Sequence, residues 1–296
     1  MNKKTKEILV AYGFLTPALI VFAIFFAIPI IAIITLSFTE YNMISPIRFV
    51  GLENFKRLFT EDKRYLKIFL NTLRYVAIFL PGHLIIGFLL ALGVNRKISP
   101  GLKYFYRTII YFPVLVTTSA VSIVWIYIYD KEFGLLNYYL GKLGIEGISW
   151  LTSSKWAFLS IAIFGIWKFV GQPLIYYLVG LQNIPESLVE AALIDGANSF
   201  QSIIYITLPV ISPTVFFVAI TVMINTLQIF DAPYILTRGG PGDATRSLNL
   251  YIYEFAYEHY DMGYASTLAL SLLALILTMT LIMFLISKKY VHYEIE

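Results

Sequence analysis

The sequence contains no cysteine, and only 14% of its 296 residues are charged. Without cysteine the chain can form neither disulfide bonds nor thiolate metal sites. It also lacks a Gly-x-Ser-x-Gly nucleophile motif, histidines spaced as metal ligands, and paired carboxylates within an apolar run. The segment Gly141-Lys142-Leu143 lacks the glycine-rich lead and the hydroxyl residue of a nucleotide-binding loop. These absences disfavour an intramembrane hydrolase, a metalloenzyme and an ATPase.

Long apolar segments dominate what is present, with 58% hydrophobic residues and a mean hydropathy of +0.75. A helix needs about 20 apolar residues to cross a membrane. Backbone groups in lipid must also be paired within the helix. The first candidate span, residues 8–39, carries no charge, and the others cover residues 75–94, 108–129, 156–181, 209–230 and 262–287. We therefore predict an all-α integral membrane protein with six transmembrane helices.

The N-terminus begins with the basic stretch MNKKTKE, as a signal peptide does. However, the following apolar run is longer than the roughly 7–15 residues of a signal-peptide core, which predicts a retained span. Aromatic residues gather near the ends of the spans, a pattern typical of the interfaces of a lipid bilayer. The net charge of +4 comes from residues in short loops rather than from a basic patch, so no nucleic-acid partner is predicted.

We predict two domains, an N-terminal part at residues 1–68 and a membrane core at residues 69–290. The N-terminal part combines the first span with a polar extracytoplasmic segment, GLENFKRLFTEDKRYLKIFLNTL, which looks like an amphipathic helix entering the second span. The distribution of lysine and arginine favours a cytoplasmic N-terminus only weakly. The basic residues expected inside lie in short loops, but the first outside loop alone contains six others.

The most unusual segment is the acidic insert between the fourth and fifth spans, IPESLVEAALIDGANSFQSIIYITLP. Pro185 suits a first helical position, and Gly196 suits a helix C-terminal stop. Asn198 or Ser199 can cap a second helix. The insert therefore predicts two short helices with a break between them, as either an interfacial structural element or a docking surface. Small residues beside acids favour a surface that a basic partner approaches closely.

The insert resembles the Glu-Ala-Ala signature of permease subunits of binding-protein-dependent ABC importers. The matching positions are Glu190, Ala191, Ala192, Gly196, Ile206, Leu208 and Pro209, with Asp195 and Ala197 also agreeing. The segments GLENFKRLF, GLQNIP, LTRGGPGDATRSLNLYIYEFAY and DMGYASTLALSLLALIL are similar to the carbohydrate-uptake branch, the maltose- and glycerol-phosphate-type first subunits. The chain departs from that pattern at Ile203, which replaces an aromatic, and by lacking the extra spans and large periplasmic insert of the maltose version.

The resemblance implies a type I ABC importer transmembrane domain in a bacterial plasma (inner) membrane. The insert at residues 185–208 would form coupling helices that dock on a cytoplasmic ATPase dimer, and both termini would be cytoplasmic. The expected ATPase-coupling residues are Glu190, Ala191, Ala192, Asp195 and Gly196. Further expected partners are a second homologous permease subunit, an extracytoplasmic solute-binding protein and a sugar. The chain itself would be no enzyme and hold no cofactor, because the ATPase would bind ATP and magnesium.

Five residues are candidates for the substrate path: Trp167, Lys168, Gln172, Asn225 and Gln228. A central lysine costs about 2.5–3.5 kcal/mol on insertion scales. Lys168 is therefore either paired inside the bundle or in contact with the hydroxyls or carboxylate of a sugar. Trp167 can stack on a sugar ring or pack between helices. The three amides either bond neighbouring helices or line the path.

A second class of function is an ion-coupled secondary transporter, in which Lys168 and His83 would act as relay groups. It leaves the acidic insert unexplained, and no inverted repeat is evident, although many secondary transporters have one. Otherwise a lone histidine such as His83 is typical of a residue satisfied within the bundle. Asp231 is interpreted as the end of the fifth span. A third possibility, an ABC permease for amino acids or peptides, fits the GGPGDAT segment less well.

Overall fold

The computed structural model describes residues 3–96 and 98–291, and these are mostly helical. The chain forms two compact units. Unit 1 combines Met1–Tyr65 with Tyr251–Leu273, and unit 2 combines Leu66–Leu250 with Ala274–Glu296. Both units therefore consist of segments that are distant in the sequence.

Unit 1 starts with an almost uninterrupted apolar helical segment. It consists of α1 (Lys3–Phe22), the π-helical turn η1 (Ala23–Ala27) and α2 (Ile28–Ser37). The part Ala11–Ser37 is long and apolar enough to cross a membrane, and its most apolar stretch has no buried residue. The strands β1 (Thr39–Glu40) and β2 (Arg48–Phe49) follow as a small antiparallel hairpin, which the sequence did not reveal.

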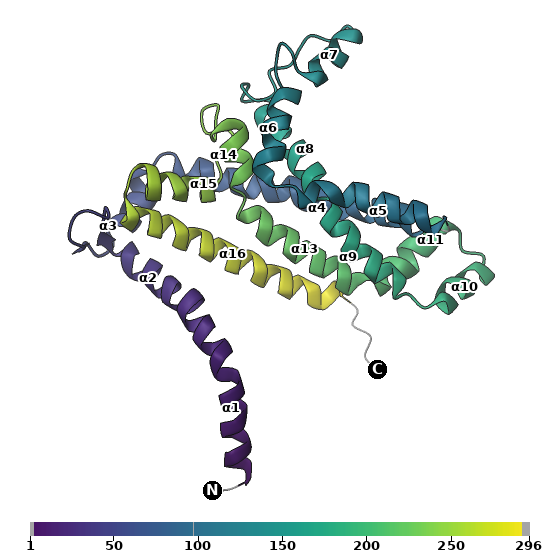
Figure 1. Ribbon diagram of the computed structural model, residues 1–296, viewed down its shortest axis with the longest axis horizontal. Helices are drawn as coiled ribbons and strands as arrows, with labels where there is room; N and C mark the ends of the chain where they lie inside the picture. Colours follow the sequence, from purple (N-terminus) through teal and green to yellow (C-terminus); the bar gives the residue numbers. More distant parts are fainter. Residues whose placement is uncertain (1–2, 97, 292–296) are drawn as a thin grey trace. The chain divides into compact units, whose positions relative to one another are not determined.

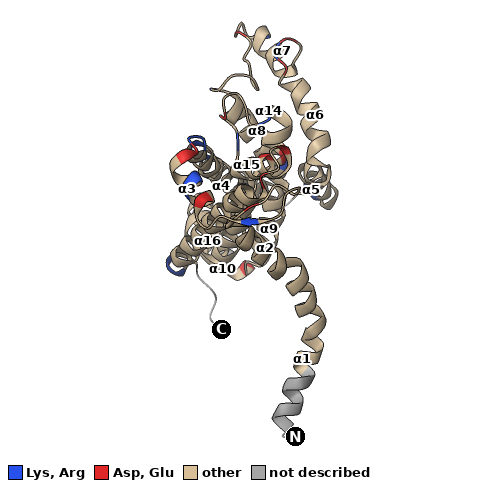
Figure 2. Ribbon diagram, turned by 90° about the vertical axis from the view of Figure 1, so that its left-hand side faces the viewer, with Lys and Arg blue, Asp and Glu red and all other residues tan. Residues whose placement is uncertain are grey.

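The polar part of unit 1 holds α3 (Glu53–Lys56) and the π-helical turn η2 (Arg57–Glu61). Figure 2 shows positive and negative residues together on α3, whereas α2 is uncharged. Arg57 forms an ion pair with Asp261 at 2.7 Å and lies over the ring of Tyr264. The carboxylate of Asp62 accepts hydrogen bonds from the hydroxyls of Tyr251 and Tyr264, at 2.8 and 2.6 Å. These contacts join segments about 200 residues apart in the sequence.

The structure breaks the amphipathic helix expected at residues 51–73 into two. The turn η2 ends at Glu61, and α4 (Tyr65–Asn95) begins four residues later. The reason is Asp62, which has an extended backbone and whose side chain accepts hydrogen bonds from the backbone N–H groups of Arg64 and Tyr65. An aspartate in this position caps the start of a helix.

The described residues contain six candidate spans, as predicted, but three of them are bent. Ala11–Ser37, α4 and α16 (Met262–Tyr290) are single helices of sufficient length. The other three are bent pairs: α5 (Pro100–Leu115) with α6 (Thr118–Ile128) at 97°, α8 (Ala157–Phe169) with α9 (Gly171–Gln182) at 44°, and Ser199–Val210 with α13 (Ser212–Leu227) at 72°. The segment Ser199–Val210 consists of α11 (Ser199–Ser202), the π-helical turn η3 (Ile203–Thr207) and α12 (Leu208–Val210).

Backbone conformation and proline account for two of these bends. Between α5 and α6, Val116 and Thr117 have extended backbones with ψ of 143° and 139°, so the helix cannot continue. The fifth span bends at Ile211, which lies between Pro209 and Pro213. Proline lacks the backbone N–H that a continuous helix requires. In a membrane, such irregular backbone is tolerated where protein or a cavity surrounds it.

Between the third and fourth spans, unit 2 has a polar hairpin that contains α7 (Leu135–Lys142). The buried amide of Asn137 donates to the carbonyl groups of Lys131 and Ile148 at 3.0 and 2.9 Å, and its oxygen accepts from Trp150 Nε1 at 2.9 Å. At the base of the hairpin, backbone N–H groups donate to Asp130 and lower the pKa of its carboxyl. One asparagine therefore joins the two ends of the hairpin.

The helices of unit 2 pack through two clusters of buried side chains. One joins α4, α9 and α13, and the other joins α4, α8 and α14 (Asp231–Thr237). At Gly165 a Cβ atom would lie 2.2 Å from the ring of Phe79, so only glycine allows α8 to approach α4 this closely. Small residues at helix contacts are typical of membrane bundles, because the stability there depends on close packing.

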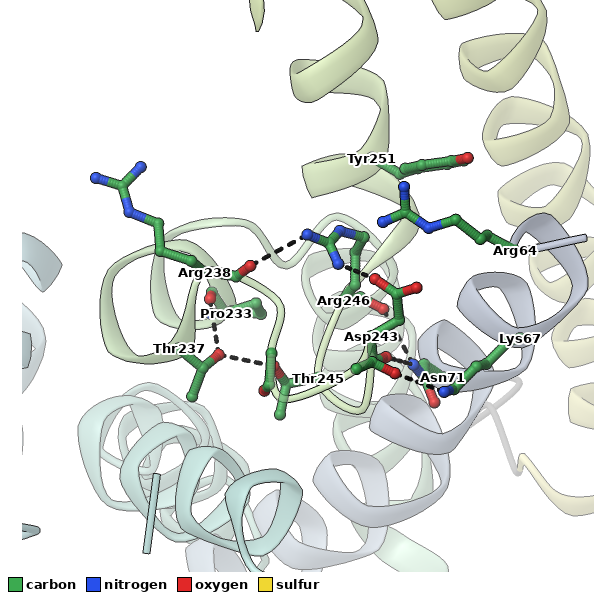
Figure 3. A network of polar contacts seen from close by, with 12 residues as sticks. Arg64, Lys67, Asn71, Pro233, Thr237, Arg238, Asp243, Thr245, Arg246 and Tyr251 are labelled. Carbon is green, nitrogen blue, oxygen red and sulfur yellow. Dashed lines mark hydrogen bonds and ion pairs between the residues drawn. The ribbon is translucent and has the colours of Figure 1, made fainter. Parts of the chain in front are cut away.

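The turn-rich segment between α14 and α15 (Leu248–Tyr253) is held by the first turns of α4. Lys67 Nζ donates to the carbonyl of Gly242 at 2.6 Å, and Asn71 Nδ2 donates to that of Asp243 at 2.7 Å. Within the segment, Arg246 bonds the carboxylate of Asp243 and the carbonyl of Arg238, as Figure 3 shows. The peptide bond before Pro241 is cis.

Candidate functional site

The acidic insert forms the predicted helix, break and second helix. Helix α10 (Glu186–Ile194) follows Pro185, and α11 follows after four residues. Glu186 lies in the first turn of α10, where a carboxylate stabilises the positive end of the helix dipole. Local sequence features therefore determine the conformation of the insert.

Both ends of the break are fixed by specific backbone interactions. Gly196 has φ of +79°, and the N–H of Ala197 donates to the carbonyl of Ala192 at 2.9 Å. This is the arrangement in which a left-handed glycine ends a helix. Asn198, rather than Ser199, caps α11: its side chain and that of Gln201 each accept the other residue's backbone N–H at 2.9 Å.

The five expected coupling residues lie together on this element and are mostly accessible. Glu190, Ala191, Asp195 and Gly196 are exposed, and only Ala192 is buried. Within residues 3–96 and 98–291, neither Glu190 nor Asp195 forms an ion pair. The insert therefore presents unpaired acids beside a small side chain.

The insert and the α7 hairpin lie at different ends of unit 2. The hairpin precedes α8, the insert follows α9, and the pair α8–α9 is a candidate span. Figure 1 shows α7 and α10 separated by the length of this pair. The two polar elements therefore lie beyond opposite ends of this candidate span.

A second feature is a cavity of about 380 Å³ within unit 2. This volume is in the range of small-molecule sites. Its polar lining consists of His83, Thr118, Gln172, Asn225, Thr226, Gln228 and Asp231. Three phenylalanines, Phe79, Phe169 and Phe230, also line it. Of the expected path residues, the structure brings Gln172, Asn225 and Gln228 to this one cavity.

The cavity lies where helices are interrupted. Thr118 begins α6 directly after the break in the third span, and Phe169 and Gln172 flank the break between α8 and α9. Gln228 ends α13, and Asp231 begins α14. Discontinuous helices place polar backbone and side chains near the middle of a membrane, as transporters do at their binding sites.

Neighbouring side chains hold the cavity wall in place. Ser247 Oγ donates to the carbonyl of Ile229 at 2.7 Å, and Asn249 Nδ2 donates to that of Gln228 at 2.8 Å. Gln172 Nε2 donates to the hydroxyl of Tyr176 at 3.0 Å. These bonds fix the backbone at residues 228–229 and the orientation of one amide.

Lys168 does not line this cavity. It is 1% exposed, and its ammonium donates to the carbonyl groups of Pro113, Val114 and Val116 at 2.5, 3.4 and 2.8 Å. These carbonyls lie at the C-terminal end of α5 and in the following break, where a helix leaves its last carbonyls without partners. Lys168 is thus paired inside the bundle, with backbone rather than with an acid.

Trp167 also lies elsewhere. Its side chain is 42% exposed and lines an apolar groove of about 540 Å³ with residues of α4, α5 and α8. Its ring lies 5.1 Å from that of Trp125. This position is that of a packing residue on the outer surface of unit 2.

Four polar residues of the cavity were not among the expected path residues. His83 is a lone histidine in an apolar run, Asp231 looks like the end of a span, and Thr118 and Thr226 have no distinguishing neighbour. The position of polar His83 within an apolar run could have indicated that it lines the cavity. The break that places Thr118 in the cavity could not be located, because the stretch 108–129 looks like one uninterrupted span.

Residues 83–292 match the family described as "Binding-protein-dependent transport system inner membrane component". The chain belongs to this family. It is 35% identical to the sulfoquinovosyl glycerol transport system permease protein SmoG of Agrobacterium fabrum, over 92% of this chain and 88% of that protein. It is 32% identical to the trehalose/maltose transport system permease protein MalF of Thermococcus litoralis, over 94% of each.

A solved structure shares the fold over almost the whole chain. It is a bacterial ABC transporter involved in the import of the acidic polysaccharide alginate, with a TM-score of 0.84 and 26% identity, covering 97% of this chain and 98% of that one. The chain is therefore a multi-pass membrane permease of the ABC importer class and depends on a binding protein. It is a transport component rather than an enzyme, and the ion-coupled interpretation is not supported.

Proposed function

We propose that this chain is one of two permease subunits of an ATP-driven importer of di- or oligosaccharides in a bacterial plasma membrane. The observation that carries the proposal is the pairing of two elements in one unit. One is an exposed acidic helix–break–helix at one end, and the other is a cavity of amides, hydroxyls and aromatic rings within the spans. SmoG and MalF, named for sugar transport, support the substrate class.

The insert is proposed to dock on a cytoplasmic ATPase through Glu190, Ala191, Ala192, Asp195 and Gly196. Exposed carboxylates attract a basic partner, and the small side chain of Ala191 allows close approach. This assignment places the insert and both termini in the cytoplasm, because an even number of spans returns the chain to the same side. The α7 hairpin then faces the extracytoplasmic binding protein.

The transport mechanism is proposed to be alternating access. ATP binding closes an ATPase dimer, the two docked inserts move with it, and the permease pair rotates to open its cavity to the binding protein. Hydrolysis reverses the motion. The ATPase binds ATP and magnesium, and this chain with a second homologous permease forms the path. In this chain, Gln172, Asn225 and Gln228 line that path.

Reconstituted complex in liposomes tests the proposal. ATPase activity is measured with the binding protein present, across panels of neutral oligosaccharides, acidic oligosaccharides, amino acids and short peptides. We expect stimulation by saccharides and insensitivity to a collapsed proton gradient. Stimulation by amino acids or peptides alone, or uptake that follows the proton gradient and not ATP, contradicts the proposal.

A further inference from the structure

The permease family leaves the charge of the sugar open, since its members include a trehalose/maltose permease and its fold occurs in an importer of acidic alginate. We propose that the cavity of this chain selects neutral saccharides and disfavours anionic ones. The inference rests on the proposed function and adds the substrate's charge to it. Four observations within unit 2 carry it.

First, the lining offers hydroxyl-binding groups without any cation. Thr118, Gln172, Asn225, Thr226 and Gln228 are uncharged donors and acceptors, and among the described lining residues there is no lysine or arginine. Phenylalanine rings beside them provide apolar surface for the faces of a sugar ring. Sites that bind a carboxylate or sulfonate normally use arginine or lysine for it.

Second, Lys168, the lysine that the sequence suggests for the substrate path, is already engaged. The three N–H donors of Lys168 meet the three carbonyl oxygens at the end of α5 and the following break. Its side chain is almost completely buried behind the wall. To bind an anionic ligand, Lys168 would have to leave these carbonyls without a partner.

Third, among the described lining residues the one charged at neutral pH is a carboxylate, that of Asp231. Asp231 is exposed in the first turn of α14. An anion in the cavity would face the negative charge of that aspartate, and like charges repel.

Fourth, His83 is bonded within the protein and offers no free group to an anion. Its Nδ1 lies 2.8 Å from the carbonyl of Phe79, and because a carbonyl only accepts, Nδ1 carries the proton. Within the described residues the buried Nε2 has no hydrogen-bond partner. This atom is closed to solvent, so a sugar hydroxyl does not reach it. The lining therefore matches the hydroxyl groups of a neutral sugar through its amides and hydroxyls.

Saturation-transfer NMR on the purified complex, with permeases and ATPases but without the binding protein, tests this selection. The binding protein is omitted because it would itself select among the substrates. The probes are maltotetraose and an oligogalacturonate of the same length, at equal concentration. For the native complex we expect a signal from maltotetraose that exceeds that of the uronate by about tenfold, because like charges suppress the wrong ligand. Equal signals, a stronger uronate signal, or no signal from maltotetraose overturns the inference.

Two variants locate the effect. Asp231→Asn, which removes the charge at similar size, should raise the uronate signal relative to the maltotetraose signal. Glu132→Gln removes an exposed charge from the α7 hairpin and should change neither. An unchanged uronate signal in a well-folded Asp231→Asn complex shows that Asp231 does not cause the selection against anionic ligands.

The outcome separates this inference from the proposed function. Uronate binding with uronate-stimulated ATPase activity leaves a sugar importer intact and removes the charge selection. Loss of saccharide stimulation altogether removes the proposed function itself.

Discussion

Two regions of this permease carry charged side chains beside or within the membrane. In one region the charge is buried and hydrogen-bonded, and in the other the charges are exposed. At the break between α5 and α6, the ammonium of Lys168 is buried and surrounded by three carbonyl oxygens. On α10, the carboxylates of Glu190 and Asp195 are exposed and form no ion pair within the described residues. The comparison indicates that the buried charge stabilises a bent span, whereas the exposed charges are available to a partner.

The largest effect on stability is expected at Lys168. Lys168→Met keeps the length of the side chain but leaves buried carbonyls at the break unsatisfied, at about 1–3 kcal/mol for each group. We expect the thermal unfolding temperature of the purified complex to fall substantially, as measured by tryptophan fluorescence.

Lys155→Met is the matched control, because Lys155 is exposed and carries no such bonds. It should change the free energy of unfolding by no more than about 0.5 kcal/mol. Equal stability of Lys168→Met and the native complex would show that the carbonyls do not need the ammonium.

The next largest effect concerns coupling. Glu190→Lys places a cation where a basic partner surface is expected, and such like-charge contacts cost several kcal/mol. Sugar-stimulated ATPase activity should fall by about a hundredfold or more. Membrane insertion should be unaffected, because the spans are untouched.

Glu132→Lys makes the same charge reversal on the α7 hairpin, at the other end of unit 2. Because this hairpin is proposed to face the binding protein, both variants are also compared by their assembly with the ATPase, which should stay at the native level for Glu132→Lys. Comparable losses in both variants would mean that the effect is not specific to α10.

A smaller effect is expected at Gly196, whose φ is +79°. An alanine in this left-handed conformation is strained by about 1–2 kcal/mol. Because this strain destabilises the conformation of the insert that docks on the ATPase, Gly196→Ala should lower stimulated ATPase activity by a factor of about 5–30.

Gly141→Ala provides the comparison, since Gly141 lies in helix α7 and a Cβ atom there would meet nothing within 4 Å. It should leave activity unchanged. A Gly196→Ala complex with native activity would show that the break between α10 and α11 is not mechanically important.

The smallest effect is expected at the start of α11. Asn198→Ala removes the side-chain acceptor for the N–H of Gln201 and should destabilise the insert by about 1 kcal/mol. Protease sensitivity of the insert in inside-out vesicles should increase.

Ser199→Ala is the control, because within the described residues the structure assigns the cap to Asn198. No change in protease sensitivity is expected. A larger effect at Ser199 than at Asn198 would reverse the capping assignment.

Where the signals are local, the sequence predicted the structure well. Pro185, Gly196 and Asn198 are sufficient to define the insert, since each acts on its own turn of backbone. The six apolar runs likewise predicted six candidate spans. The cavity was only partly predictable: Gln172, Asn225 and Gln228 are polar residues in apolar runs and do line it.

What the sequence could not provide were the bends and their consequences. The stretch 108–129 looks like one span, yet its break at Val116 and Thr117 brings Thr118 to the cavity and creates the carbonyls that bind Lys168. Lys168 faces the bundle and not a sugar because it contacts the carbonyl of Val116, more than 50 positions away in the sequence. The division 1–68 and 69–290 and the roles of the coupling residues remain predictions.

The most direct test uses the absence of cysteine from this sequence. A single Ala191→Cys permease is labelled with benzophenone maleimide in the assembled complex and irradiated, and the products are separated by mass. We predict a covalent adduct between this permease and the ATPase subunit, and none with Glu132→Cys, which lies on the α7 hairpin. An ATPase adduct from Glu132→Cys but not from Ala191→Cys would contradict the docking of α10 and, with it, the orientation of the chain.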